Sequence, residues 1–380
     1  MKPFILFLLV SDLFTFNILK AQNNQNNNIS FVFEGVVTGF EKNSKLYIDY
    51  HSDNITKSSD TITLKDNYFI FHGDFPANQI VLEAIIRTED YSDYRYLYID
   101  NKKIRFIAEK QKFFDAEIIG SETHLAEKKY KDLIRLEQSQ MDSLSALSFK
   151  LPNNDTKEVW DSIFKIKTEI DKIKEMVLKN YTIPFIKNNT KSYYSLLLLN
   201  TYHNSFGKET TEDLYNSLPK KFQNHKIGLE IKKFIQLNKE ISIGNPFEEI
   251  IQKGVDNKLY KLSDLKGKFI LLEFWSSNCG PCRKENPKLK ELYDKYHGLG
   301  FEIYAVSADV SDIMWKKAIE KDKLEWINVS ELNGTKNTAF LTYGVNEMPT
   351  NYLIDPNGII IGKNIRKHQL EAKLLEIFKF

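Results

Sequence analysis

The chain is poor in cysteine. Only two of its 380 residues are cysteines, Cys279 and Cys282, and two residues separate them. Exported proteins that use disulfides as a scaffold place their cysteines so that the bonds join distant segments. A bond across two residues closes too short a loop to stabilise a fold appreciably. The pair is therefore predicted to be reactive rather than structural.

The chain also lacks clustered histidines and an excess of charge of either sign. Its seven histidines are scattered without ligand spacing, so no metal and no other cofactor is predicted. Lys and Arg total 53 against 51 Asp and Glu, a formal net charge of +2. A nucleic-acid partner would require basic residues clustered on one surface, and none is predicted.

The N-terminal segment has the pattern of an export signal. Lys2 precedes an apolar run over residues 4–10, which resumes over 13–19, and Ala21 is a small residue at a suitable cleavage point. This order predicts a signal peptide over residues 1–21, cleaved near Ala21, and a periplasmic protein. An uncleaved membrane anchor is the alternative. No cysteine lies near this segment, so the protein is not expected to be a lipoprotein.

The next part of the chain changes from polar to β-like. Residues 22–28 are almost all Gln and Asn, which predicts a disordered leader. Over residues 29–121, short runs rich in aromatic and β-branched residues alternate with turn formers. This pattern predicts an antiparallel β sandwich or barrel.

Residues 122–240 have a helical pattern. Six apolar residues at heptad spacing mark one helix face: Val159, Ile163, Ile166, Ile170, Ile173 and Val177. An antiparallel hairpin with the preceding helix is one interpretation of this face. A homodimer through the 159–177 helix is the other. Residues 241–246 are predicted to link this region to the last domain.

The cysteines lie where a strand is followed by a helix. Residues 269–275 form a near-continuous apolar run, typical of a strand buried on both faces. A helix is predicted to begin at about the cysteines, and its N-terminus favours a thiolate. Pro281 suits the first turn because it has no N–H to leave unpaired. We expect Cys279 to be exposed and to attack a disulfide, and Cys282 to be shielded and to resolve the mixed disulfide.

Residues 244–380 resemble a thioredoxin-fold domain of the TlpA/ResA type. The resemblance is carried by the run Phe274-Trp275-x-x-x-Cys279-Gly280-Pro281-Cys282-Arg283-x-Glu285-x-Pro287, by the strand-like run 301–309, and by Met348-Pro349-Thr350 and 353–358. Trp315 and the helix-like run to Lys323 resemble the insertion that separates this branch from plain thioredoxins. It implies a redox disulfide between the two cysteines. It also implies substrate contacts at Trp275, Gly280, Pro281, Met348 and Pro349.

Two further positions take their expected roles from this resemblance. Pro349 is expected to be cis and to flank Cys279, with an ordinary turn proline as the alternative. Glu273 occupies the position of a buried acid that exchanges a proton with Cys282, and an exposed edge glutamate is the alternative. The chain departs from the thioredoxin pattern in having Glu rather than Asp there, Ala305 where a lysine often faces the acid, and Asn278 before the first cysteine.

The β-like region has a resemblance of its own. Residues 29–121 resemble the small β-rich domain that precedes thioredoxin-like domains in exported proteins of Bacteroidetes-type bacteria, on their strand pattern and on Gly120-Ser121 before the helices. No activity follows from it. The predicted fold class is thus a multi-domain chain with an N-terminal antiparallel β domain, a central α-helical segment and a C-terminal α/β thioredoxin fold.

The predicted function is that of an exported protein-disulfide oxidoreductase that reduces disulfides. Gly280-Pro281 is the dipeptide of reducing members near about −270 mV rather than of oxidants near about −120 mV. The resemblance implies exported protein disulfides as partners, with apocytochromes among them, and a membrane-bound thiol reductase as electron donor. The alternatives are a disulfide isomerase or oxidant, a peroxiredoxin-type peroxidase, whose Pro-x-x-x-Thr-x-x-Cys setting is absent, and a binding or assembly protein with a secondary redox domain.

Overall fold

The computed structural model describes residues 28–52, 55–76, 79–152 and 156–378. The predicted signal peptide lies outside these ranges, as does the predicted leader except for Asn28, which begins the first strand. Within the described ranges, no helix is long and apolar enough to cross a membrane.

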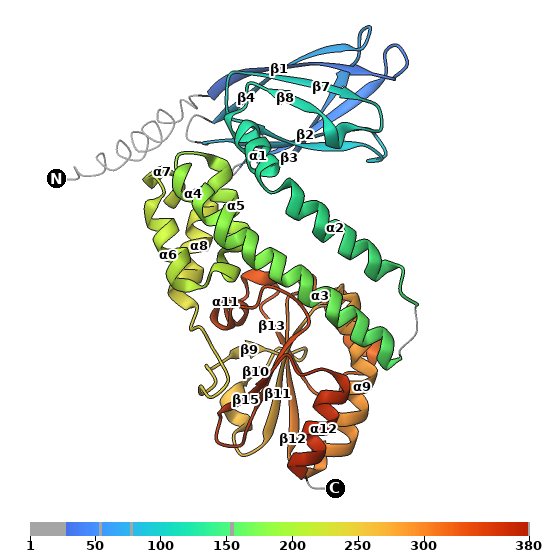
Figure 1. Ribbon diagram of the computed structural model, residues 1–380, viewed down its shortest axis with the longest axis vertical. Helices are drawn as coiled ribbons and strands as arrows, with labels where there is room; N and C mark the ends of the chain where they lie inside the picture. The colour runs from blue at the N-terminus through green and yellow to red at the C-terminus, as the bar shows by residue number, and fades with distance from the viewer. Residues whose placement is uncertain (1–27, 53–54, 77–78, 153–155, 379–380) are drawn as a thin grey trace, which may run out of the picture. The chain divides into compact units, whose positions relative to one another are not determined.

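The chain divides into two compact units (Figure 1). The first unit comprises residues 1–173 and 192–194, and the second comprises 174–191 and 195–380. The predicted helical region 122–240 is therefore not a domain of its own, because the division falls within the helix α3 (Lys157–Val177). Its first helices belong with the β-rich region and its later helices with the thioredoxin-like region.

The described part of the first unit contains eight strands: β1 Asn28–Thr38, β2 Lys45–Ser52, β3 Ile55–Thr63, β4 Tyr68–Pro76, β5 Leu82–Arg87, β6 Tyr94–Ile99, β7 Lys103–Glu109 and β8 Glu117–Ile119. They form two four-stranded sheets with the orders β4-β1-β7-β8 and β3-β2-β5-β6. Phe33 and Ile104 from one sheet share a buried core with Ile48 and Leu97 from the other. The predicted β sandwich is confirmed.

One strand pair departs from the predicted antiparallel pattern. β1 pairs with β7 in parallel, with Val32 opposite Lys103, although the other pairs in the two sheets are antiparallel over the described residues. A parallel pair needs a crossover connection, and here the whole of the other sheet lies between the two strands in sequence. Strand pattern alone does not show which distant strands will pair.

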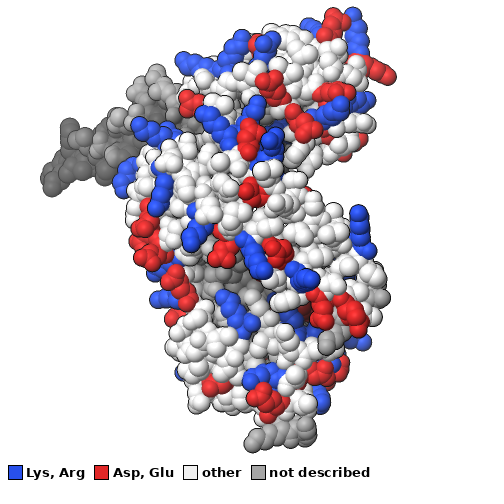
Figure 2. Space-filling view, viewed as in Figure 1, with Lys and Arg blue, Asp and Glu red and all other residues white. Residues whose placement is uncertain are grey.

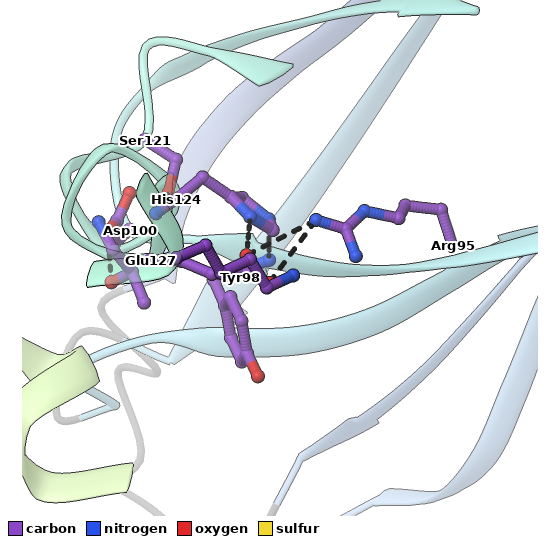
Figure 3. A network of polar contacts seen from close by, with 8 residues as sticks. Arg95, Tyr98, Asp100, Ser121, His124 and Glu127 are labelled. Atoms are coloured by element: carbon purple, nitrogen blue, oxygen red, sulfur yellow. Dashed lines mark hydrogen bonds and ion pairs between the residues drawn. The ribbon is translucent and has the colours of Figure 1, made fainter. Parts of the chain in front are cut away.

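A polar network joins the helix α1 (Glu122–Leu133) to the edge strand β6 (Figure 3). The hydroxyl of Ser121 caps the helix by accepting from the backbone N–H of His124. Nε2 of His124 accepts from the N–H of Tyr98 at 3.0 Å, and Nδ1 lies 2.8 Å from Oε2 of Glu127. The histidine thereby satisfies an amide at the open edge of the sheet, which would otherwise have no strand partner.

Glu127 is the centre of this network. Arg95 lies 3.2 Å from one carboxylate oxygen, and Lys131 lies 2.5 Å from the other. Burial opposes ionisation of this carboxyl, but hydrogen bonds from His124 and Lys131 and the charge of Arg95 outweigh it and lower the pKa of Glu127 to about 2. The carboxylate therefore stays charged and holds the helix on the sheet.

The helices α2 (Arg135–Phe149) and α3 follow in sequence. Residues of α2 and Ile173 of α3 line one hollow of about 350 Å³, which agrees with the predicted hairpin. No side chain of α2 is buried, and Leu136 and Phe149 on α2 and Phe164 on α3 are exposed. The homodimer through 159–177 remains a prediction.

The second unit combines five short helices with a thioredoxin-like fold. The helices are α4 Ile183–Asn188, α5 Tyr193–Phe206, α6 Lys208–Ser217, α7 Lys220–Gln223 and α8 Lys226–Leu237. The predicted linker that follows them packs against the sheet of this unit, because Ile241 is buried in the core and Gly244 donates its N–H to Ile360.

The thioredoxin-like region contains β9 Ile251–Lys253, β10 Leu259–Lys261, β11 Phe269–Trp275, α9 Gly280–Tyr296, β12 Phe301–Ser307, α10 Asp312–Asp322, β13 Ile327–Ser330, α11 Thr338–Tyr343, β14 Thr350–Ile354, β15 Ile360–Lys363 and α12 Lys367–Phe378. Its main sheet has the order β13-β12-β11-β14-β15, with β14 antiparallel to β11. The α/β thioredoxin-like fold class is confirmed.

The side chains of β11 point alternately to the two faces of the sheet and contribute to two separate cores. Ile270, Leu272 and Phe274 pack on one face of the sheet with residues of α11. Leu271 and Trp275 pack on the other face with residues of α9, α10 and α12. Because successive side chains of a strand point to opposite faces, Glu273 lies on the same face as α9 and the cysteine pair.

Candidate active site

The cysteines lie at the junction between β11 and α9. Cys279 is the N-cap of α9, and its Sγ accepts a hydrogen bond from the backbone N–H of Cys282 at 3.2 Å. The two sulfurs form a disulfide in this structure. Cys282 is 2% exposed, whereas Cys279 is partly exposed. The expected placement of an accessible first cysteine and a shielded second one is confirmed.

A buried aspartate holds the loop that precedes Cys279. Asp309 accepts from the backbone N–H of Ser277 at 2.9 Å and from the hydroxyls of Ser277 and Ser307. The loop is thereby tied to the end of β12. The backbone at the N-terminus of α9 is held in place before any substrate arrives.

The helix α10 corresponds to the predicted insertion. Its Trp315 is buried in the same core as Cys282. Asp322 at its end pairs with Arg283 and accepts from Asn286 at 2.8 Å, both of them on α9. The insertion therefore braces the helix that carries the cysteines.

The peptide bond between Met348 and Pro349 is cis, as the resemblance implied. This bond lies just before β14, the neighbour of β11. Met348 and Cys279 are both partly buried and pack against the core cluster that contains Cys282. Met348 also packs against the core on the opposite face of the sheet, so this loop contacts both cores.

Glu273 is buried, with 5% exposure, so the alternative of an exposed edge glutamate is wrong. Its strand neighbours are Ala305 on β12 and Asn351 on β14. Burial, together with the nearby charge of Glu285, raises the pKa of Glu273 to about 8, although the positive charge of Arg366 opposes the rise. This carboxyl therefore changes its protonation state near neutral pH and can exchange a proton.

Two charged residues of the site were missed by the sequence analysis. Glu285 lies one turn beyond Cys282 on α9, and burial also raises its pKa. Arg366 lies 3.2 Å from Oε2 of Glu285 and 3.7 Å from Oε1 of Glu273. The spacing of three residues from Cys282 could have indicated Glu285. No local signal indicates Arg366, which is distant in sequence.

The predicted substrate contacts fall into two groups. Gly280 and Pro281 are exposed beside Cys279, and Met348 and Pro349 lie in the loop described above. Trp275 is a correction: its side chain is 2% exposed and packs in the core with Cys282. A buried indole offers no surface to a protein substrate, so this residue supports the cysteine helix instead.

These features define a thioredoxin-like disulfide oxidoreductase. The AhpC/TSA family model matches residues 243–363, and the model of a domain of unknown function (DUF4369) matches residues 31–126. ResA thiol-disulfide oxidoreductase from Bacillus cereus is 37% identical over 147 residues, which cover 38% of this chain and 83% of that protein. The chain belongs to the ResA family of thiol-disulfide oxidoreductases.

A second ResA protein agrees with this assignment, and one solved structure is also similar to part of the chain. ResA thiol-disulfide oxidoreductase from Bacillus subtilis is 32% identical over 36% of this chain and 74% of that protein. Among solved structures, the thioredoxin domain of a thiol-disulfide oxidoreductase from Bacteroides vulgatus is 33% identical. That comparison covers 36% of this chain and 99% of the other, with a TM-score of 0.35.

Proposed function

We propose that this oxidoreductase reduces disulfides in exported proteins, with Cys279 as the attacking thiolate and Cys282 as the resolving thiol. The observation that carries the proposal is the position of Cys279. Cys279 is partly exposed at the N-terminus of a 17-residue helix, and its Sγ accepts a hydrogen bond from a backbone N–H there. Both the helix dipole and that hydrogen bond favour a thiolate over a thiol.

The reaction proceeds in two exchange steps. The thiolate of Cys279 attacks one sulfur of the substrate disulfide, a mixed disulfide forms, and the other substrate sulfur leaves as a thiolate. Cys282 then loses its proton and attacks the sulfur of Cys279, and the second substrate sulfur leaves with the bonding electron pair. The substrate gains two electrons and the Cys279–Cys282 disulfide forms, as it stands in this structure.

The substrate is proposed to be an extended segment of an exported protein. Gly280 and Pro281 are exposed on one side of Cys279, and Met348 offers backbone groups just before an extended strand. Lys and Arg are interspersed with Asp and Glu over the face seen in Figure 2, without a continuous patch of one sign. We therefore propose that backbone contacts rather than net charge position the substrate.

The cell compartment and the electron donor complete the proposal. Residues 1–21 have the pattern of a cleaved signal peptide, which supports a periplasmic protein, with an uncleaved anchor as the alternative. A periplasmic reductant needs electrons from across the membrane, so a membrane-bound thiol reductase is the expected donor. Apocytochromes that await haem are one class of substrate within this proposal.

The reduction potential of the Cys279–Cys282 pair tests the direction of electron flow. The purified chain is equilibrated with thiol buffers of known potential, and free thiols are trapped and counted by mass spectrometry. A potential near or below about −250 mV supports the reductant. A potential above about −180 mV would contradict it and favour the isomerase or oxidant.

A further inference from the structure

Arg366 bridges three separate parts of the active site. One guanidinium nitrogen lies 3.2 Å from Oε2 of Glu285 on α9 and 3.7 Å from Oε1 of Glu273 on β11. Another donates a hydrogen bond to the backbone carbonyl of Pro349. Arg366 directly precedes α12 in sequence, and its side chain joins the buried acid Glu273, the cysteine helix and the cis-proline loop.

The other groups that face Glu273 do not add a neighbouring cation. β12 presents Ala305 opposite it, and β14 presents Asn351, whose amide oxygen and nitrogen bond the backbone of Ile365. At the start of α12, Lys367 acts on Glu285 electrostatically. Within the described residues, Arg366 is therefore the cation in direct reach of both carboxyls.

Arg366 carries one positive charge, so it cannot neutralise both Glu273 and Glu285 if both acids ionise. Glu273 is 5% exposed, and its Oε2 has no hydrogen-bond partner within the described residues. The other oxygen faces Arg366, and the side chain of Asn351 also hydrogen-bonds this carboxyl. A buried carboxylate with one unpartnered oxygen is still costly, and two carboxylates that share a site do not readily ionise together. One guanidinium balances one carboxylate, so the other acid holds a proton.

We propose that Arg366 is a positioning residue that keeps a single negative charge shared between Glu273 and Glu285, and so sets the pH at which Glu273 can take the proton of Cys282. This inference rests on the proposed role of Cys282 as the resolving thiol. In that step Glu273 accepts the thiol proton, and the sulfur of Cys282 bonds to that of Cys279. The bond from Cys279 to the substrate breaks, and the substrate sulfur leaves with the electron pair.

The first experiment follows the titration of the two carboxyl groups directly. Protein labelled with ¹³C at the glutamate carboxyl carbon is titrated by NMR in the disulfide form, and E273Q and E285Q assign the two resonances. In R366Q we expect the midpoint of the Glu273 titration to rise by at least one pH unit, because a stabilising positive charge is lost. R366K keeps the positive charge and is expected to move the midpoint of the Glu273 titration by less than half a pH unit.

The variant E285Q is expected to shift the midpoint of the Glu273 titration in the opposite direction. E285Q removes a negative charge beside Glu273, so the midpoint of Glu273 is expected to fall. A general loss of packing would raise or lower the midpoint alike in R366Q and E285Q, whereas the proposal requires opposite directions. Unchanged midpoints in both variants, or shifts of the same sign, would overturn it.

The same variants are then tested for turnover. The rate of insulin disulfide reduction is measured from pH 5 to 9, with circular dichroism as the check on folding. R366Q is expected to lose about tenfold in rate at pH 7 for each unit by which the Glu273 midpoint rises. The wild-type reduction potential decides the proposed direction of electron flow, whereas only the differences among these variants decide the role of Arg366.

Discussion

Each unit of the protein contains a buried glutamate close to an arginine, and the two carboxyls behave in opposite ways. Glu127 in the first unit has Arg95, Lys131 and His124 around it, and its pKa is lowered to about 2. Glu273 in the second unit shares its one neighbouring arginine with a second acid, and burial raises its pKa to about 8.

The difference lies in the number of partners as well as in burial. The carboxylate of Glu127 receives hydrogen bonds on both oxygens, which offset the cost of burying its charge. Glu273 has an oxygen without a partner and competes for a cation. A buried acid with enough partners fixes structure, and one with too few can change its protonation state near neutral pH.

The largest expected effect comes from removing the chemistry of the second unit. C279S should abolish insulin reduction, because the remaining thiol of Cys282 is buried, and C282S should trap the mixed disulfide with substrate. Turnover is measured by insulin precipitation, and the trapped complex by non-reducing gel electrophoresis. Activity of C279S above a tenth of wild type would place the chemistry elsewhere.

E273Q tests the acid of the second unit. The amide keeps the shape but cannot accept the proton of Cys282, so we expect a loss of about 10²-fold in the rate of resolution at pH 7. Stability should not fall, because a costly buried acid is removed. Insulin reduction and chemical denaturation measure the two effects. E127Q is the matched control and should retain activity.

E127Q tests the acid of the first unit. Loss of the carboxylate leaves Arg95 and Lys131 without their charged partner, so the free energy of unfolding of this unit should fall by about 3 kcal/mol. Urea denaturation followed by circular dichroism measures the change. E122Q, at an exposed position on the same helix, is the control. Equal stability of the two variants would refute a structural role for Glu127.

The smallest expected effect is the pH dependence of the free energy of unfolding of the first unit. The pKa of Glu127 is lowered from 4.5 to about 2, and that of Asp49, held by Arg87, from 3.8 to about 2 despite burial. Depressed pKa values stabilise the folded state above the unfolded pKa, and this contribution is lost as pH falls toward 2. Between pH 7 and pH 4 we expect a loss of about 1 kcal/mol.

Denaturation of the wild type at several pH values measures this loss of stability. In E127Q most of the loss between pH 7 and pH 4 should disappear, because Asp49 has the lower unfolded pKa and titrates later. If E127Q and the wild type lose the same stability between pH 7 and pH 4, other groups control the stability at acid pH.

The parts of the site that depend on local sequence were predictable. The buried strand, the cysteine helix and the Met348-Pro349 loop each have a contiguous pattern, and all three contribute to the core that contains Cys282. The burial of Glu273 also followed from its place in an apolar strand. Trp275 was misjudged because a resemblance in sequence does not show whether a side chain is exposed or buried, and its indole is 2% exposed.

Features that depend on long-range pairing were not predictable from one sequence. Arg366 meets Glu285 only because α12 packs beside α9, and nothing near either residue in sequence indicates the pair. The parallel pairing of β1 with β7 has the same origin. The division of the chain within α3 was hidden because a continuous helix pattern gives no sign that its two ends belong to different units.

The position of β1 also affects when the first unit can fold. This strand is the first of its sheet to be synthesised, yet it hydrogen-bonds β4 on one edge and β7 on the other. Until the ribosome has produced nearly the whole unit, one edge of β1 remains open to other chains. Such distant pairing slows folding and lengthens the period in which a nascent chain is vulnerable to aggregation.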